Sequence, residues 1–134
     1  MKTLILFSVT CLILLSGCGS HVTRTTDKGL FHIKLSSKGE LLTYGRNEVD
    51  ILVTDNKGNG IESATIEITP WMPEHGHGST WPPTVTEKGN GLYGAVIPLV
   101  MIGHWELKFT IRKGDLEDIT VFDFPNVMNS RTTS

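Results

Sequence analysis

One segment of the chain concentrates the residues that are best suited to binding chemistry. Residues 69–83 contain two tryptophans, four prolines, one methionine and a His-Gly-His pair. Prolines restrict the backbone and glycines allow close approach, so the imidazoles of His75 and His77 are expected to lie near one another at low entropic cost. Rigid loops with such side chains often bind a ligand. The segment therefore predicts a binding loop between two strands.

Catalysis has little support in the sequence. There is no Gly-x-Ser-x-Gly nucleophile turn and no His-Glu-x-x-His pattern. Ser79 follows His77 closely, but no third group that would orient the histidine is identifiable. We therefore expect a binding protein and not an enzyme, with no catalytic residues.

Chain length and net charge narrow the class of protein further. The chain has 134 residues, 39% of them hydrophobic, and a formal net charge of −2. This composition is typical of one small globular domain. A near-neutral chain without clustered Lys and Arg lacks the electrostatic footprint of a nucleic-acid-binding protein. We expect no nucleic-acid partner.

The N-terminus has the pattern of an export signal. Lys2 precedes an apolar run, Leu4 to Leu15, which is shorter than the roughly 20 residues of a membrane-spanning helix. The following Leu15-Ser16-Gly17-Cys18 resembles the bacterial lipobox, in which the cysteine is lipidated before cleavage. Residues 1–17 are therefore predicted to be a lipoprotein signal peptide, and Cys18 the lipidation site. An ordinary secreted protein cut nearby and an uncleaved anchor are the alternatives.

The predicted location follows from the same residues. Lipidation at Cys18 would attach the exported protein to the bacterial membrane. Gly19 stands where lipoproteins retained in the inner membrane commonly have aspartate. In a host with two membranes, the resemblance therefore favours the periplasmic side of the outer membrane.

Most of the remaining chain has the sequence pattern of β-strands. Residues 18–29 are polar and rich in threonine, which predicts a flexible tether after the lipidated cysteine. Between residues 30 and 125, apolar residues recur at every second position, and clusters of Gly, Asn and Asp separate the runs. This pattern predicts an all-β domain, an antiparallel immunoglobulin-like β-sandwich of six to seven strands, with a small barrel as the alternative. Residues 126–134 are predicted to be a polar tail. The alternating runs are 31–35, 49–53, 64–68, 93–97, 105–111 and 119–121.

Three ordered motifs resemble the YtkA-like (FixH-related) domain family. They are Met72-Pro-Glu-His-Gly-His-Gly78, Gly89-Asn-Gly-Leu-Tyr93 and Met101-Ile-Gly-His-Trp-Glu-Leu107. The similarity covers roughly residues 30–112. The resemblance implies an exported or membrane-tethered immunoglobulin-like domain, sometimes associated with copper handling or cytochrome oxidase maturation.

This family context suggests a set of metal ligands. Thioether and imidazole are ligand types that suit copper, and the soft sulfur favours Cu(I). The candidates that match the family motifs are Met72, His75, His77 and Met101. His104 occupies a variable position of the third motif and is added on local grounds. The ligand hypothesis thus comprises Met72, His75, His77, Met101 and His104, with copper as the metal.

Other interpretations of the same segment stay open. The histidines could make hydrogen bonds within a turn while Met72 and Met101 fill the end of the core. Glu74 could supply an oxygen ligand to zinc. The loop could instead contact an envelope protein in a structural or interaction module that binds no metal. A third possibility is a carbohydrate-binding module that uses Trp71 and Trp81 as a platform.

Overall fold

The computed structural model describes residues 19–131, and its regular elements are nine β-strands without a helix. Within these residues no helix has the length and apolarity that a membrane crossing requires. The predicted signal peptide and Cys18 lie outside the described residues. The strands are β1 Ser20–Thr25, β2 His32–Ser37, β3 Gly45–Thr54, β4 Thr65–Met72, β5 His77–Gly78, β6 Thr84–Gly89, β7 Leu92–Leu99, β8 Gly103–Lys113 and β9 Leu116–Val127.

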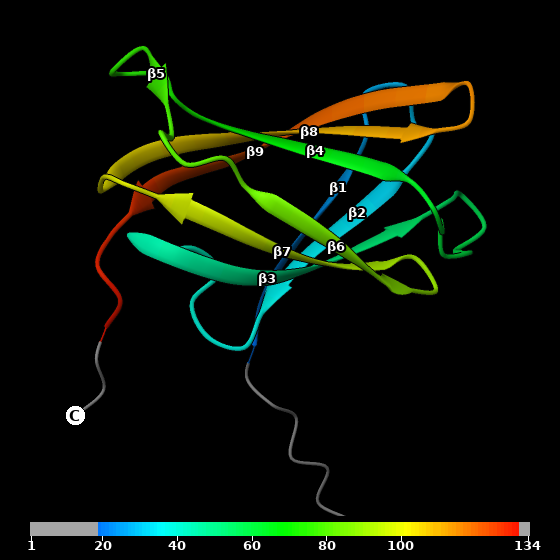
Figure 1. Cartoon of the computed structure of the whole chain (residues 1–134), viewed down its shortest axis with the longest axis horizontal. Coiled ribbons are helices and arrows are strands. Elements are labelled where there is room, and N and C mark those ends of the chain that lie inside the picture. The colour runs from blue at the N-terminus through cyan, green and yellow to red at the C-terminus, as the bar shows by residue number, and fades with distance from the viewer. Residues whose placement is uncertain (1–18, 132–134) are drawn as a thin grey trace, which may run out of the picture.

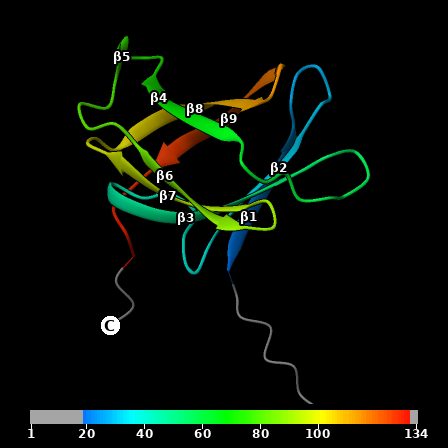
Figure 2. The same cartoon turned by 45° about the vertical axis from the view of Figure 1, so that its right-hand side comes forward.

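The strands form two antiparallel sheets that pack face to face (Figures 1 and 2). One sheet has the order β1-β2-β3-β7-β6, and the other has the order β5-β4-β8-β9. The arrangement β2-β3-β7-β6 opposite β4-β8-β9 is the strand order of an immunoglobulin-like sandwich. The predicted all-β sandwich is therefore confirmed, and the barrel alternative is excluded.

The core is made by the alternating apolar positions. Every second residue of β8 from Trp105 to Ile111 is fully buried, and the intervening residues other than Thr110 keep some exposure. The same alternation occurs in β4 of this sheet, and in β3 and β7 of the other sheet, which supply facing side chains, as expected when each strand presents one face to the interior. The Trp105 indole N–H donates to the backbone oxygen of Met101 at 2.9 Å, so this buried donor is satisfied.

The number of strands exceeds the predicted six to seven. The additional strands are β1, β5 and β6. β1 and β6 lie at the two edges of the five-stranded sheet, and each contains a single apolar residue, Val22 or Val85. One apolar residue cannot produce a detectable alternation, so edge strands of this kind carry no periodic signal. β5 has only two residues and pairs with the end of β4.

Two predicted boundaries are wrong. The expected tether over residues 18–29 contains β1, whose six residues all pair with β2. The expected tail from residue 126 begins too early, because β9 continues to Val127, whose side chain is 1% exposed. In both places the sequence is polar, but the backbone pairs with a neighbouring strand. The strand conformation there results from this tertiary contact and not from the local sequence pattern.

A buried carboxylate ties the β1–β2 turn to β9. Asp118 is 1% exposed and accepts hydrogen bonds from the backbone N–H groups of Lys28, Leu30 and Ile119 at 2.9–3.2 Å. Burial tends to raise the pKa of Asp118, but the Thr26 hydroxyl and these N–H groups outweigh it and lower the pKa below its ordinary value. The ionised carboxylate therefore stabilises a junction between the two sheets.

Two turns approach each other closely at the end of the sandwich that carries Lys57. Gly91 lies at a φ of +80°, and a Cβ built on it would lie 2.5 Å from the Cα of Gly60 and 2.6 Å from the backbone oxygen of Val53. Nearby, the Tyr93 hydroxyl donates to the backbone oxygen of Ile61 at 2.7 Å. The Gly89-Asn-Gly-Leu-Tyr93 motif thus has a structural explanation, which is close packing against the β3–β4 connection.

Candidate metal site

The β4–β5 turn presents the His-Gly-His segment to solvent. The backbone N–H groups of His75 and Gly76 both donate to the oxygen of Met72, at 3.2 and 2.9 Å. Gly76 closes the turn at a φ of +67°, a conformation that glycine adopts without strain. The turn stands above the sandwich at one end, where Figures 1 and 2 show β5 projecting from the four-stranded sheet. Glu74, His75 and His77 are exposed as a result.

The imidazoles of His75 and His77 are near one another, as the sequence predicts. Their ring centroids are 5.8 Å apart and their planes are inclined by 38°. His77 also places Nδ1 3.0 Å from the backbone oxygen of Gly78, a contact within the turn. This contact agrees with the alternative in which an imidazole N–H satisfies a backbone carbonyl. The pair is available to a ligand, but it is not enclosed.

A second group of polar side chains lies on the outer face of the four-stranded sheet. His104 and Glu106 are two residues apart on β8 and therefore share one face, and Asp123 on β9 is the direct cross-strand partner of Glu106. One ligand atom from each of these three residues lies within 4.8 Å of the other two. The cluster of His104, Glu106 and Asp123 is called the β8–β9 cluster below.

The β4–β5 turn reaches this cluster through Glu74. The His104 Nε2 atom lies 2.5 Å from Oδ1 of Asp123, and its Nδ1 atom lies 3.9 Å from Oε1 of Glu74. On the other side of Glu106, its cross-strand partner on β4 is Trp71. One imidazole, three carboxylates and an indole thus gather at one end of the sheet. The excess of negative charge favours a cation at this position.

His104 is electrostatically coupled to its neighbours. The hydrogen bond to Asp123 is the main cause that raises the pKa of His104 above its ordinary value of 6.5, and Asp123, Glu74 and Glu106 add to this through their charges. Partial desolvation opposes the shift without cancelling it. A metal ion binding through His104 must displace this proton, so such binding weakens as the pH falls.

The coupling can be measured directly. We expect an NMR titration to give His104 a pKa above 6.5, and Asp123→Asn to lower it, because the substitution removes the main stabilising partner of the imidazolium. The linked stabilisation of the fold is present below pH 6.5 and is lost as the pH rises through the raised pKa. Glu117→Gln on β9 is the control, since Glu117 pairs with Arg112 and not with His104. An unchanged His104 pKa in Asp123→Asn would contradict the assignment.

The two methionines of the ligand hypothesis occupy different environments. Met72 is 1% exposed, and its terminal methyl lies 3.2 Å from the position that a Cβ on Gly103 would take. Its thioether is part of the packed core at the start of β8. Met101 is 38% exposed and lies in the β7–β8 turn. The burial of Met72 favours the core-filling alternative for this residue.

Sequence reasoning missed Glu106 and Asp123. The pattern His104-x-Glu106 on an alternating strand places both side chains on one face, so Glu106 could have been found from the period of two. Asp123 had no comparable signal, because its position beside Glu106 depends on the pairing of β8 with β9. Of the five predicted ligands, the structure brings His104 into a cluster of possible ligand atoms with other residues.

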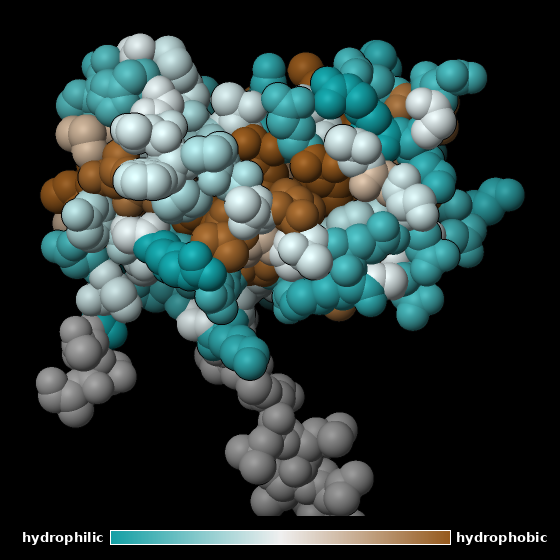
Figure 3. Space-filling model, viewed as in Figure 1, coloured by the Kyte–Doolittle hydropathy of each residue, from teal (hydrophilic) through white to brown (hydrophobic). Residues whose placement is uncertain are grey.

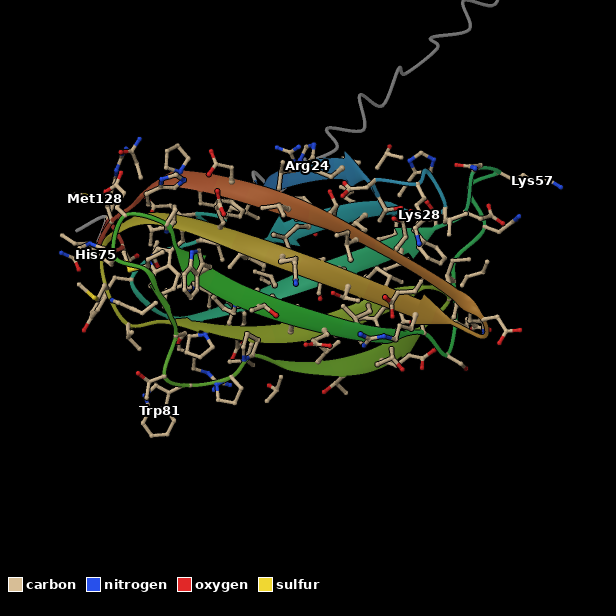
Figure 4. The ribbon with its side chains drawn as sticks, turned by 90° about the horizontal axis from the view of Figure 1, so that it is seen from above. Arg24, Lys28, Lys57, His75, Trp81 and Met128 are labelled. Carbon is tan, nitrogen blue, oxygen red and sulfur yellow. The ribbon has the colours of Figure 1, made fainter. Side chains whose placement is uncertain are left out.

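Both tryptophans of the binding loop are exposed, and Trp71 lines an open groove. Trp71 is 43% exposed and Trp81 is 66% exposed. The groove runs between the outer edges of β4 and β6, has a volume of about 680 Å³ and is lined in part by Ile66, Ile68 and Val85. Figure 3 shows the apolar side chains in the middle of this face. In Figure 4, Trp81 points away from the body of the molecule, at the edge opposite Arg24.

Fold and site together define a class: a small immunoglobulin-like sandwich with a histidine and carboxylate cluster at one end of its four-stranded sheet. Residues 28–110 match the YtkA-like family, and the chain belongs to this family. The match agrees with the resemblance carried by the three motifs, and Asp123 lies beyond it. Comparison with curated proteins and with solved structures gives no significant match.

Proposed function

We propose that this chain is a lipid-anchored extracytoplasmic domain that binds a divalent metal ion at the β8–β9 cluster. The observation that carries the proposal is the approach of three ligand atoms, from His104, Glu106 and Asp123, to within 4.8 Å of one another. The sequence pattern around Cys18 supports export and anchoring. The proposed role is to bind or pass on an ion, without transforming a substrate.

The donor set favours copper in its divalent state. An imidazole nitrogen and carboxylate oxygens are ligands of intermediate and hard character, which suit Cu²⁺ and Zn²⁺. Among first-row divalent ions, such a site binds Cu²⁺ most tightly. Cu(I) prefers thioether sulfur, and Met72 contributes its sulfur to the core instead. We therefore propose Cu²⁺ as the preferred ion and Zn²⁺ as its competitor.

Neighbouring residues would complete the site. Glu74, whose Oε1 atom is 3.9 Å from Nδ1 of His104, offers an additional oxygen donor, and His75 and His77 lie on the same turn. The Trp71 side chain lies across from Glu106 and can shield one side of a bound cation. These residues would join the β4–β5 turn to the sheet when an ion binds.

Titration of the purified protein with Cu²⁺ and Zn²⁺ against a chromophoric chelator tests the proposal. We expect stoichiometric Cu²⁺ binding that is tighter than Zn²⁺ binding. His104→Ala combined with Asp123→Asn should weaken it by roughly 10- to 100-fold or more, since even the outer partners of metal ligands have effects of this size. His75→Ala combined with His77→Ala reports whether the turn contributes. His21→Ala, on β1, is the matched control and should change nothing.

Two results would decide against the site. Equal affinity in the His104 and Asp123 double variant would remove the β8–β9 cluster from the proposal. If the protein bound Cu(I) more tightly than Cu²⁺ and Met101→Leu abolished this binding, the metal site would contain the Met101 thioether instead. Circular dichroism on each variant confirms that the comparison is between folded proteins.

A protein-interaction module is the second candidate. The groove between β4 and β6 supports it, because apolar side chains line part of it between two sheet edges and the exposed Trp71 flanks it. Such grooves occur where proteins recognise partners. If the unaltered protein bound neither Cu²⁺ nor Zn²⁺, this candidate would be favoured.

A further inference from the structure

The edge of the five-stranded sheet begins next to the predicted lipid attachment. β1 starts at Ser20, two residues after Cys18, and pairs with β2 along its whole length. A residue spans at most about 3.6 Å, so two residues allow about 7 Å between the lipidated residue and the sheet. No long tether therefore separates this edge from the anchor. β1 has no strand partner on its outer side within the described residues.

Charge is distributed unevenly between this edge and the rest of the domain. Residues 19–38 contain four cations and one carboxylate, a net charge of +3, whereas residues 39–134 contain seven cations and thirteen carboxylates, a net charge of −6. All four cations are exposed, and among the described residues none of their charged nitrogens lies within 4.0 Å of a carboxylate oxygen. The four are Arg24, Lys28, Lys34 and Lys38. The Lys28 ammonium donates to the backbone oxygen of Glu117 at 3.0 Å.

The cations can act together along one edge. Lys34 is the cross-strand partner of Thr23, whereas Arg24 is the partner of Ile33, so Arg24 and Lys34 lie on opposite faces of the β1–β2 pair. Long side chains on both faces can reach a flat surface that the edge itself approaches. Figure 4 shows Arg24 at one long edge of the molecule, Lys28 in the same half, and Trp81 at the opposite edge.

We propose that the β1–β2 edge lies on the anionic headgroups of the membrane that holds the lipid anchor. The inference rests on the proposed lipidation of Cys18. Basic residues without a carboxylate partner beside a membrane attachment are attracted to anionic lipid over about a Debye length. The net negative charge of the remaining surface is repelled by the same headgroups, so both parts favour one orientation. In this orientation Trp81 and the groove between β4 and β6 face away from the membrane.

Cations on an edge strand have a second known role, which is to prevent pairing with the strands of other molecules. This role predicts no difference between anionic and neutral membranes. The test therefore measures orientation as a function of lipid charge.

The experiment uses the full chain, produced with its signal in a bacterial host and reconstituted into vesicles. Intact-mass analysis of the same sample first establishes whether Cys18 carries lipid. This result distinguishes a protein without a lipid anchor from an anchored protein that lacks the proposed orientation. A fluorophore is attached to Thr23→Cys on β1 or to Thr80→Cys beside Trp81, and headgroup spin labels act as quenchers. Vesicles contain phosphatidylcholine with or without phosphatidylglycerol.

With phosphatidylglycerol, we expect the position 23 label to be quenched several-fold more than the position 80 label. Arg24→Glu combined with Lys34→Glu should remove most of this difference, and added salt should reduce it. The matched control, Lys57→Glu combined with Lys108→Glu, reverses two cations outside the edge and should preserve it.

Two outcomes would overturn the inference. Equal quenching at positions 23 and 80 would show that the anchored domain has no preferred edge. An equal preference in neutral vesicles, or one that survives Arg24→Glu with Lys34→Glu, would show that the cations do not orient the domain. Circular dichroism of each variant ensures that a lost preference reflects charge and not unfolding.

Discussion

Gly91→Ala is expected to lower the free energy of unfolding by at least about 4 kcal/mol, in the range that marks exceptional substitutions. The new methyl would lie 2.5 Å from the Cα of Gly60 and 2.7 Å from the backbone nitrogen of Ile61. These neighbours are backbone atoms, so a rotamer change cannot relieve the contact. The φ of +80° adds a conformational cost of about 1–2 kcal/mol.

Gly114→Ala separates the two contributions to this effect. Gly114 also has a positive φ, +56°, but no atom lies within 4 Å of the position its Cβ would take. Gly114→Ala should therefore lower the free energy of unfolding only by the conformational contribution, about 1–2 kcal/mol. Urea unfolding of both variants measures the difference. Similar losses at the two positions would mean that the close approach of the turns contributes nothing.

Asp118→Ala should destabilise the domain by about 3–5 kcal/mol, because it leaves three partly buried N–H groups without an acceptor. The carboxylate accepts from three backbone N–H groups, and two of them belong to Lys28 and Leu30 in the distant β1–β2 turn. Asp115→Ala removes an exposed carboxylate in the neighbouring turn and should change the free energy of unfolding by no more than about 0.5 kcal/mol.

Acidification provides an independent measurement of the same interaction. The pKa of Asp118 is lowered in the folded protein, so its stabilisation is present above the unfolded value of 3.8 and is lost as the pH falls through the folded value. The unaltered protein should thus lose stability below about pH 4, and Asp118→Ala should lose less over the same interval. Parallel pH profiles for the two proteins would contradict a buried, ionised Asp118.

The sandwich could be predicted from sequence because its central strands alternate strictly. Trp105, Leu107 and Phe109 each occupy an inward position that the period of two assigns, and all three are fully buried. The sequence pattern did not predict β1 and β6, because an edge strand is half surrounded by solvent and needs few apolar residues. Local pattern therefore identifies the interior strands and not the borders of the sheets.

The candidate site was only partly predictable for a related reason. His104 could be named from its residue type, but its partner Asp123 comes from a strand 19 residues away, and their contact depends on strand pairing. Met72 matched a family motif, yet the residue type alone does not distinguish a ligand from a core side chain. The sequence shows which residues carry suitable ligand atoms, whereas the fold determines which of these atoms lie close together.

The bonds between the β1–β2 turn and Asp118 also have a consequence for the order of folding. They join residues 90 positions apart, so the N-terminal turn cannot complete its hydrogen bonds until the chain has been synthesised past Asp118. The loop between them is long, and contacts of this kind form late because closing the loop costs entropy before any contact repays it. Docking of residues 28–30 onto β9 is therefore expected to be a closing step, and a chain that ends before Asp118 would leave its first turn without a carboxylate acceptor.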